Sequence, residues 1–520
     1  MKPLAQIVAA NAAQSPDGLA FLEAERRLSW RDYHARSDRL AGVLAGLDLG
    51  PGARVAVWLP DGPGVHVVWL ACEKTGLVVV GIGPRAGLAE LRHLLEKTGA
   101  TALVSRARHR DVDVCRVFAE LRGAGLPLRH HVVIEADVEP DEPVFEGARP
   151  AAREARALGP EDLFLLNSTS GTTGLPKCVT QHQARWFHFH ELAVEAADLD
   201  ERDVFMSLLP APFGFGLWTA HFTPALLGAP TLLMERFDAD RALAAIEEHR
   251  VSVLAAVSTQ FILLLNSPEI ARRDLSSLRV LFTGGEAVPT ERAVEFEDRT
   301  GAAVLQFYGS NETGALSRTT LRDSREVRLG SAGRVIESMQ VRLFDDDGAD
   351  VTATGRGQPG CRGVLTCRGY YEDAAANAKL VREDGWMLTG DVATLEDGVL
   401  RVIGRTADFI IRGGKNISGP AVEAAVSTHP AVALAAAVAM PDPVFGERVC
   451  VYAELRVDTT LTLEELVAHL SAAGVSKEWF PERLEIVDAL PRASGGKVAK
   501  QALREDVCRQ LGEDVRRRLA

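Results

Sequence analysis

Short apolar runs alternate with longer stretches of helical apolar spacing through most of the first four hundred residues of the chain. The runs that predict strands lie at 54–59, 77–82, 102–105, 163–166, 231–234, 253–257 and 279–283. The stretches that predict helices include 65–74, 88–97 and 239–249. Strands that alternate with helices pair in parallel and are covered by those helices. The pattern therefore predicts a large α/β domain of parallel sheets with helices on their faces.

The pattern changes after about residue 330, where short strands and turns replace the alternation. Strands predicted at 341–344, 363–367 and 398–403 indicate a small β-rich subdomain at about 330–404. The rest of the chain predicts helices at 419–428 and 463–471 and strands at 432–440, 449–455 and 483–486, which is an α+β arrangement. We therefore expect an N-terminal domain at 1–404, a linker at 405–408 and a small C-terminal domain at 409–520.

Composition and charge narrow the range of partners. The 520 residues carry a formal net charge of −13, whereas nucleic acids and anionic membranes attract basic surfaces. The seven cysteines are odd in number and scattered, which fits a reducing compartment better than a disulfide framework or a zinc site. No apolar run reaches the roughly 20 residues that span a bilayer, and the N-terminus lacks the pattern of a signal peptide. We expect a cytoplasmic monomer or homodimer without nucleic-acid or membrane partners.

The segment at 168–177 carries the most information about function. It reads Ser-Thr-Ser-Gly-Thr-Thr-Gly-Leu-Pro-Lys, directly after the strand predicted at 163–166. Glycines allow a ligand to approach the backbone, hydroxyls and amides donate hydrogen bonds, and Lys177 adds a positive charge, all of which suit phosphate groups. The spacing differs from the Gly-x-x-x-x-Gly-Lys-Ser/Thr loop of P-loop NTPases. It predicts a phosphate loop of another kind, formed by Thr169, Ser170, Gly171, Thr172, Thr173 and Gly174.

This loop resembles the signature loop of the acyl-adenylate-forming superfamily, which includes acyl- and aryl-CoA synthetases, and the resemblance extends over essentially the whole chain. A second shared motif, at 307–313, reads Phe-Tyr-Gly-Ser-Asn-Glu-Thr. The resemblance implies that Tyr308 packs against adenine, that Glu312 helps to hold Mg²⁺, and that Thr313 or Ser310 meets the α-phosphate region. A flat ring offers a stacking face, and a carboxylate offers the hard oxygen that Mg²⁺ prefers. The nucleotide site implied here also includes Gly309 and Asn311.

Two more segments complete the implied nucleotide site. Gly284, Gly285 and Glu286 follow the strand predicted at 279–283 and resemble the segment that lies along adenine and one wall of the acyl pocket. For Glu286, a plain strand-ending turn is nearly as good an interpretation. Residues 385–391 read Gly-Trp-Met-Leu-Thr-Gly-Asp, and the resemblance implies that Asp391 accepts hydrogen bonds from the ribose hydroxyls. Arg405 resembles an arginine that reaches the ribose or a phosphate.

Gly495, Gly496 and Lys497 follow Leu490-Pro491-Arg492 and resemble a further motif of the superfamily. This resemblance implies that a mobile domain carries Lys497. In the superfamily, the matching lysine enters the active site on a loop of a mobile C-terminal domain, where its charge relieves the repulsion between the carboxylate and the α-phosphate. The same domain then rotates about a hinge, here at Ala407, and brings Gly413 and Gly414 to a tunnel for the thiol. The superfamily usually has Asp or Lys at the hinge position where this chain has Ala407. The resemblance therefore leaves open how efficient the domain rotation is.

The segment at 212–218 reads Pro-Phe-Gly-Phe-Gly-Leu-Trp and resembles the aromatic lining of the acyl pocket. Phe213, Phe215 and Trp218, with Gly284, are the residues assigned to that pocket, which favours an apolar or ring-bearing acid. For Trp218, an ordinary place in a helix core is an equally good interpretation. The histidines of the segment at 186–190 lack partners at ligand spacing, so a packed helix is expected there rather than a metal site.

Together these motifs imply an AMP-forming acid–thiol ligase with the adenylate-forming enzyme fold. The enzyme would use ATP and Mg²⁺ to convert a carboxylic acid to acyl-AMP, release pyrophosphate, and then transfer the acyl group to coenzyme A. Two alternatives stay open. The chain could load a separate acyl carrier protein or stop at the adenylate, or it could be a silent nucleotide-binding protein, against which the retention of Lys497, Glu312 and Asp391 argues.

Overall fold

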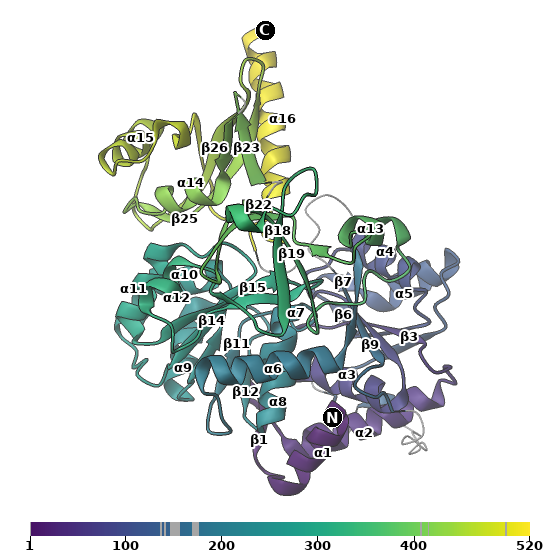
Figure 1. Cartoon of the computed structure of the whole chain (residues 1–520). Coiled ribbons are helices and arrows are strands. Elements are labelled where there is room, and N and C mark those ends of the chain that lie inside the picture. Colours follow the sequence, from purple (N-terminus) through teal and green to yellow (C-terminus); the bar gives the residue numbers. More distant parts are fainter. Residues whose placement is uncertain are drawn as a thin grey trace.

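The computed structural model describes residues 2–135, 138–139, 142–145, 157–168, 176–405, 408–413, 415–493 and 497–519. Figure 1 shows a large body, built from most of the chain, on which the C-terminal residues form a separate unit at the top. None of the helices in these residues is both long and apolar enough to cross a membrane.

A six-stranded sheet forms one part of the body. Its strand order is β10–β9–β4–β3–β5–β8, and β10 pairs antiparallel with β9 whereas the other pairs are parallel. The strands are β3 (Arg54–Trp58), β4 (Val78–Gly81), β5 (Ala102–Ser105), β8 (His130–Val133), β9 (Leu163–Ser168) and β10 (Cys178–His182). The runs at 54–59, 77–82, 102–105 and 163–166 are therefore strands, as predicted. β9 ends at the residue before the predicted phosphate loop.

A second sheet of 14 strands runs through the rest of the body. Its central strands are parallel: β15 (Ala303–Ser310), β14 (Val280–Gly284), β13 (Val253–Ala255), β11 (Phe205–Ser207), β12 (Thr231–Leu233) and β1 (Leu19–Glu23). Antiparallel strands extend it at both ends: β2 (Arg26–Ser29) at one, and β16 (Gly314–Arg318) and β17 (Arg334–Val335) at the other. The parallel core confirms the α/β interpretation of the alternating pattern.

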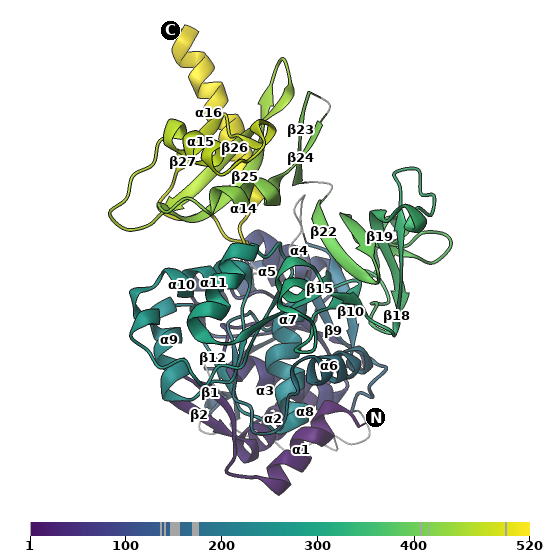
Figure 2. The same cartoon turned by 60° about the vertical axis from the view of Figure 1, so that its left-hand side comes forward.

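Helices cover these sheets (Figures 1 and 2). Those of the body are α1 (Leu4–Gln14), α2 (Trp30–Gly46), α3 (Pro63–Thr75), α4 (Leu88–Thr98), α5 (Val114–Gly123), α6 (Gln183–Ala197), α7 (Gly214–Gly216), α8 (Thr223–Leu227), α9 (Ala239–Glu248), α10 (Ser258–Asn266), α11 (Thr290–Thr300), α12 (Arg325–Gly330) and α13 (Ala374–Leu380). Every residue of α3 is buried. A helix that is buried all round packs on several layers at once, so α3 helps to join them.

The β-rich subdomain continues the larger sheet instead of forming a sheet of its own. Its strands are β18 (Met339–Phe344), β19 (Arg356–Gly363), β20 (Met387–Leu388), β21 (Asp391–Glu396) and β22 (Val399–Arg405), and β22 pairs with β17. Figure 2 shows β18, β19 and β22 projecting from one side of the body. The strand predicted at 363–367 is wrong, because β19 ends at Gly363 and a turn follows. The N–H of Cys367 donates to the carbonyl of Glu312 (2.7 Å) instead of to a neighbouring strand.

The C-terminal unit is the predicted α+β fold. It contains β23 (Phe409–Arg412), β24 (Lys415–Ser418), α14 (Gly419–Val426), β25 (Val432–Asp442), β26 (Gly446–Leu455), α15 (Leu463–Ala472), β27 (Arg483–Ile486) and α16 (Lys500–Leu519). β25 packs against α10 of the body, and Asn266 Nδ2 donates to the carbonyl of Ala433 (3.2 Å). One apolar cluster includes side chains from both parts, such as Leu264 and Leu434. This contact holds the unit over the carboxyl ends of the parallel strands.

Candidate active site

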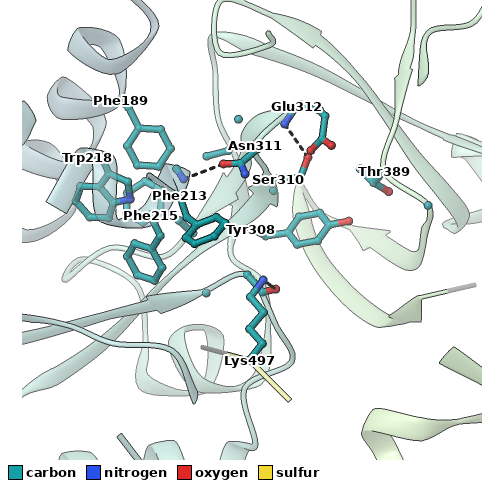
Figure 3. Close-up of a pocket in the computed structure, with 18 of the residues that line it drawn as sticks. Phe189, Phe213, Phe215, Trp218, Tyr308, Ser310, Asn311, Glu312, Thr389 and Lys497 are labelled. Carbon is teal, nitrogen blue, oxygen red and sulfur yellow. Dashed lines mark hydrogen bonds between the residues drawn. The ribbon is translucent and has the colours of Figure 1, made fainter. Parts of the chain in front are cut away.

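A cavity of about 590 Å³ lies where β14 and β15 end, between the body, the β-rich subdomain and the C-terminal unit. Carboxyl ends of parallel strands are the usual place for ligands in open α/β sheets. Figure 3 shows that aromatic side chains gather at one end of this cavity and hydroxyl and carboxyl groups at the other. We call the end with Phe189, Phe213, Phe215 and Trp218 the aromatic end of the cavity, and the end with Tyr308, Ser310, Glu312 and Thr389 its polar end.

The aromatic end is formed by the predicted segment at 212–218 and by α6. Phe215 and Trp218 stack with their centroids 5.6 Å apart and their planes 12° from parallel. Phe189 of α6 lies 5.1 Å from Trp218. A π-helical turn, η2 (Leu217–Phe222), carries Trp218, and a side chain at Gly216 would lie 2.3 Å from the carbonyl of Pro210. The packing around this turn is therefore so close that only glycine fits at position 216.

Trp218 lines the cavity and is at the same time only 2% exposed, so its place in the packed core and a place beside the acid are compatible. Phe213, Phe215 and Gly284, which the resemblance assigns to the acyl pocket, also line the cavity. Other lining residues were not assigned to the site from the sequence: Trp186, Phe189, Leu209, Val257, Ala315 and, within the motif at 307–313, Phe307. The two in α6 belong to the segment at 186–190, which is a packed helix, as predicted. Only their aromatic character could have drawn attention to them.

At the polar end, Tyr308 and Asp391 meet although they are far apart in the sequence. The Tyr308 hydroxyl donates to Asp391 Oδ2 (2.6 Å), and Arg405 Nε lies 3.3 Å from Asp391 Oδ1. Burial raises the pKa of Asp391, and the charge of Arg405 opposes that rise. Burial and the neighbouring carboxyl also raise the pKa of Tyr308 well above its ordinary value. Tyr308, Arg405 and Thr389 line the cavity, so this cluster forms one wall of it.

The loop at 309–313 separates the two candidates for the α-phosphate position. Ser310 lines the cavity, whereas Thr313 does not and is only 1% exposed. The Thr313 hydroxyl accepts the backbone N–H of Ser310 (2.9 Å) and donates to the carbonyl of Gly314 (2.9 Å), so it stabilises the turn. A side chain at Gly309 would lie 1.7 Å from that carbonyl. Ser310 thus presents the hydroxyl, and Thr313 and Gly309 shape the loop that carries it.

Glu312 lines the cavity beside a tyrosine that the sequence analysis missed. The hydroxyl of Tyr370 donates to Glu312 Oε1 (2.8 Å), and Lys177 Nζ lies 4.8 Å from the centre of the Tyr370 ring. Burial, followed by the charge of Glu312, raises the pKa of Tyr370 far above its ordinary value. In the described part of the chain, no three His, Cys, Asp or Glu side chains group as ligands of one metal ion. A divalent cation here would have one protein carboxylate, that of Glu312.

Lys497 reaches the cavity from the C-terminal unit (Figure 3). Its ammonium group donates to the carbonyl of Gly285, and a side chain at Gly285 would lie 2.9 Å from that group. Burial lowers the pKa of Lys497, and the charge of Glu286 opposes this most strongly. Glu286 Oε1 accepts the N–H of Thr259 (3.2 Å), and Glu286 itself is not part of the cavity lining. The C-terminal unit therefore brings a cation to the polar end.

The other predicted site residues lie elsewhere or outside the described residues. Gly413 forms the turn between β23 and β24 and is not part of the cavity lining; its N–H donates to the carbonyl of Phe445 (2.8 Å). Asn311, by contrast, lines the cavity. The residues outside the described ranges are Thr169, Ser170, Gly171, Thr172, Thr173, Gly174, Ala407 and Gly414.

Comparisons with known proteins show what this chain is similar to. The chain is 31% identical over 490 residues to the medium-chain fatty-acid–CoA ligase of Escherichia coli. The aligned region covers 92% of this chain and 85% of that protein. It is 30% identical over 503 residues to the 2,3-dihydroxybenzoate-AMP ligase of Bacillus subtilis, covering 96% and 93%. Among solved structures, the anthranilate CoA ligase AuaEII in complex with anthranoyl-AMP has the same fold, with a TM-score of 0.88, 22% identity and 98% of both chains covered.

Two family models match the two parts of the chain. The model described as AMP-binding enzyme matches residues 8–371, and the model described as AMP-binding enzyme C-terminal domain matches residues 421–497. The first match alone spans more than half of the 520 residues, and it includes most of the cavity lining. The second ends at the lysine that enters the cavity. The chain therefore belongs to the AMP-binding enzyme family.

Proposed function

We propose that this protein activates a carboxylic acid with ATP and transfers the acyl group to the thiol of coenzyme A. The observation that carries the proposal is the single cavity that joins an aromatic end to a polar end, with Lys497 entering from the C-terminal unit. An adenylating enzyme must hold an acid and a nucleotide in contact and place a cation between them. The two ends of this cavity and Lys497 meet those three needs.

The polar end holds the nucleoside in this proposal. The Tyr308 ring offers an apolar face to adenine, and its hydroxyl fixes Asp391. Each carboxylate oxygen can accept more than one hydrogen bond, so Asp391 keeps acceptor capacity for the ribose hydroxyls. The positive charge of Arg405 opposes the rise in the Asp391 pKa that burial causes, and so favours the ionised carboxylate. We assign the phosphates that leave to the loop at 169–174, since it follows β9.

Lys497 serves the first chemical step. A carboxylate oxygen of the acid forms a bond to the α-phosphorus, the bond from that phosphorus to the bridging oxygen breaks, and pyrophosphate leaves with the electron pair. Nucleophile and phosphate are both anions, so a cation between them lowers the barrier. The contact of Lys497 with the Gly285 carbonyl places its ammonium group at the edge of the cavity before any anion binds.

The residues present fit a magnesium ion bound mainly through the nucleotide. Mg²⁺ commonly takes one or two protein carboxylates together with substrate phosphates and water. Glu312 would be the protein ligand, and Tyr370 holds one of its oxygens and so orients the other. When bound, the ion neutralises charge on the phosphate oxygens.

In the second step the thiol releases its proton to solvent and the thiolate sulfur forms a bond to the acyl carbon. The bond from that carbon to the AMP oxygen breaks, and AMP leaves with the electron pair. Gly413 lies away from the cavity, so we propose that the C-terminal domain, residues 409–520, turns about the hinge at 405–408 to bring Gly413 and Gly414 to the thiol. The hinge assignment rests on Ala407 and on the short linker between β22 and β23. We also propose that the protein is a monomer or a homodimer and that it is located in the cytoplasm.

One observation favours a second candidate function. The relative from Bacillus subtilis is named an AMP ligase, and the one from Escherichia coli a CoA ligase, at nearly the same identity. A chain with this cavity could therefore stop at the adenylate or pass the acyl group to a separate carrier protein. Its aromatic end favours a ring-bearing acid, and the names of two similar proteins contain 2,3-dihydroxybenzoate and anthranilate.

Pyrophosphate exchange tests the proposal. The purified protein is incubated with ATP, Mg²⁺ and labelled pyrophosphate across a panel of aliphatic, alicyclic and aromatic acids, and coenzyme A is then added to the acids that respond. Exchange with at least one acid and formation of its thioester are the expected results. Exchange without any thioester would favour the second candidate. No exchange with any acid would contradict both.

A further inference from the structure

We propose that Asn311 recognises the acid, by donating a hydrogen bond from its carboxamide to an acceptor atom next to the reacting carboxylate. The favoured substrate is then an aromatic acid with an oxygen substituent on the neighbouring ring carbon. This inference rests on the proposed function and names the substrate class of the same cavity. It also moves Asn311 from the nucleotide site, where the motif had placed it, to the acid.

The orientation of the Asn311 carboxamide is fixed by one contact. The backbone N–H of Gly214 donates to Asn311 Oδ1 (2.9 Å), as the dashed line in Figure 3 shows. A backbone N–H needs an acceptor, so the oxygen must face Gly214 and the NH₂ group must face the other way. Among the described residues, no side chain or backbone group accepts a hydrogen bond from that NH₂ group. Two N–H donors are thus held in place without a partner among the residues that the structure describes.

Gly214 makes this arrangement possible. A side chain there would lie 2.4 Å from Asn311 Oδ1 and 3.1 Å from the ring of Trp186. The first distance is too short for any real contact, so a larger residue would push the carboxamide away. The segment at 212–218 therefore contributes more than the aromatic rings that the sequence predicts, since its backbone sets the direction of a polar group in the turn after β15.

The position of Asn311 decides which part of a ligand it meets. Figure 3 shows it between the aromatic side chains of Phe189 and Phe213 and the polar residues Ser310 and Glu312. An acid whose carboxylate faces Lys497 and whose ring lies in the aromatic end must have its first carbons at this boundary. The donor therefore lies beside the carboxylate and not at the far end of the ring.

The surroundings of this donor make the cavity selective among acids that differ in the group next to the carboxylate. The residues that line the aromatic end have mainly aromatic and aliphatic side chains. A ligand that covers the half-buried Asn311 donor without offering an acceptor would leave it buried and unpaired, which costs free energy. An oxygen substituent next to the carboxylate would accept the N–H, whereas a methyl group of similar size would leave it unpaired. Sites built to hydrogen-bond a substrate discriminate strongly against analogues that lack the bonding group. We therefore expect selection by chemistry and not by size alone.

The test compares acids that differ in a single substituent. The values of kcat/KM for pyrophosphate exchange are measured with 2-hydroxybenzoate, 2-methoxybenzoate, 2-methylbenzoate and benzoate. The protein should prefer both oxygen-bearing acids to 2-methylbenzoate by about ten- to a hundredfold. Asn311→Asp keeps an acceptor for Gly214 and removes the donor, so it should abolish this ratio. Any repulsion between the new charge and the carboxylate affects all four acids and cancels in the ratio.

Two further variants guard against a misleading result. Asn311→Leu removes the donor without adding charge, and Gly214→Ala displaces the carboxamide; both should reduce the same ratio to within a few-fold of one. A ratio that is near one in the parent, or that stays unchanged in the variants, would overturn the inference. An equal loss with all four acids would also overturn it, because the donor would then serve the carboxylate itself.

Binding measurements separate failure of this inference from failure of the proposed function. Calorimetric titration with sulfamoyl-adenosine analogues of the same four acids needs no turnover. If no acid supports exchange, the proposed function fails, yet a preference for oxygen-bearing analogues that Asn311→Asp removes would still support the inference. If exchange proceeds but neither measurement shows the preference, the inference alone is wrong.

Discussion

The two ends of the cavity are built in different ways. At the polar end, a few residues are joined by hydrogen bonds and ion contacts, such as Tyr308 to Asp391 and Tyr370 to Glu312. At the aromatic end, rings from α6, from the segment at 212–218 and from β15 are held by packing. Chemistry that is the same for every acid needs fixed polar groups, whereas the pocket for the acid is formed mainly by packed rings, with Asn311 as the polar group at its boundary. The contrast explains why relatives can share a reaction and differ in substrate.

The strongest way to test this contrast is to remove the cation at the polar end. Lys497→Ala should reduce pyrophosphate exchange by about a thousandfold, because the charge between two anions is lost. The same variant should still form a thioester from a supplied acyl-AMP, since that step requires no attack on phosphate. Exchange and single-turnover thioester formation are measured on the same preparation.

Lys500→Ala is the matched control for the lysine. Lys500 pairs with Glu423 (2.8 Å) within the C-terminal unit and does not line the cavity. Its removal should change exchange by much less than that of Lys497. An equal loss of both half-reactions in Lys497→Ala would contradict the assignment of this residue to the first step alone.

The carboxylate of Glu312 provides the second test of the polar end. Glu312→Gln keeps an oxygen for the Tyr370 hydroxyl but removes the charge that Mg²⁺ prefers. Exchange should fall by about a hundredfold and require more Mg²⁺ for half-maximal rate. The rate is measured against Mg²⁺ concentration at saturating acid. Tyr370→Phe, which removes only the supporting hydrogen bond, should have the smaller effect; the reverse order would place the ion elsewhere.

The same contrast limits what the sequence can predict. Tyr308, Glu312, Asp391 and Lys497 stand in short motifs because their chemistry demands fixed residue types at fixed spacing. Tyr308, Glu312 and Lys497 line one cavity, and Asp391 lies behind its wall, where it accepts the Tyr308 hydroxyl. Tyr370 lies 58 positions from Glu312 and belongs to none of the motifs, so only the fold reveals it. Phe189 is one of several aromatic residues on a helix, and nothing in its local sequence separates pocket from core.

Errors in the predicted elements have the same origin. The alternating pattern predicts β3, β4, β5, β9, β12, β13 and β14, because each of these strands depends on its own apolar residues. The parallel strands β1, β8, β11 and β15 were not predicted. The run at 363–367 is apolar enough for a strand but forms a turn, because the N–H of Cys367 donates to Glu312. Helix α16 was not predicted. A contact made by residues distant in the sequence decided the first of these outcomes, and no local pattern contains it.

At the aromatic end, loss of packing should change substrate binding more than chemistry. Trp218→Leu removes the ring that stacks on Phe215, so the KM for the acid should rise about tenfold while the KM for ATP stays near the parent value. Because Trp218 is buried, the variant should also lose about 2–4 kcal/mol of unfolding free energy. Steady-state kinetics and urea unfolding measure the two effects. An equal rise of both KM values would show that the ends are not independent.

The smallest expected effect is a shift in the pH dependence of exchange. Lys497 must be protonated to act, and burial lowers its pKa below 10.5, so activity should fall as the pH rises through that lowered value. The charge of Glu286 opposes the shift most strongly, with Asp391 and Glu312 acting in the same direction and Arg405 against them. Glu286→Gln should therefore move the alkaline limb of the kcat/KM profile to lower pH, by less than about one unit. Trp218→Leu, which changes no charge, should leave the limb in place. A limb that moves to higher pH in Glu286→Gln would show that Lys497 does not control it. A limb that moves equally in both variants would show that the two ends share a titrating group.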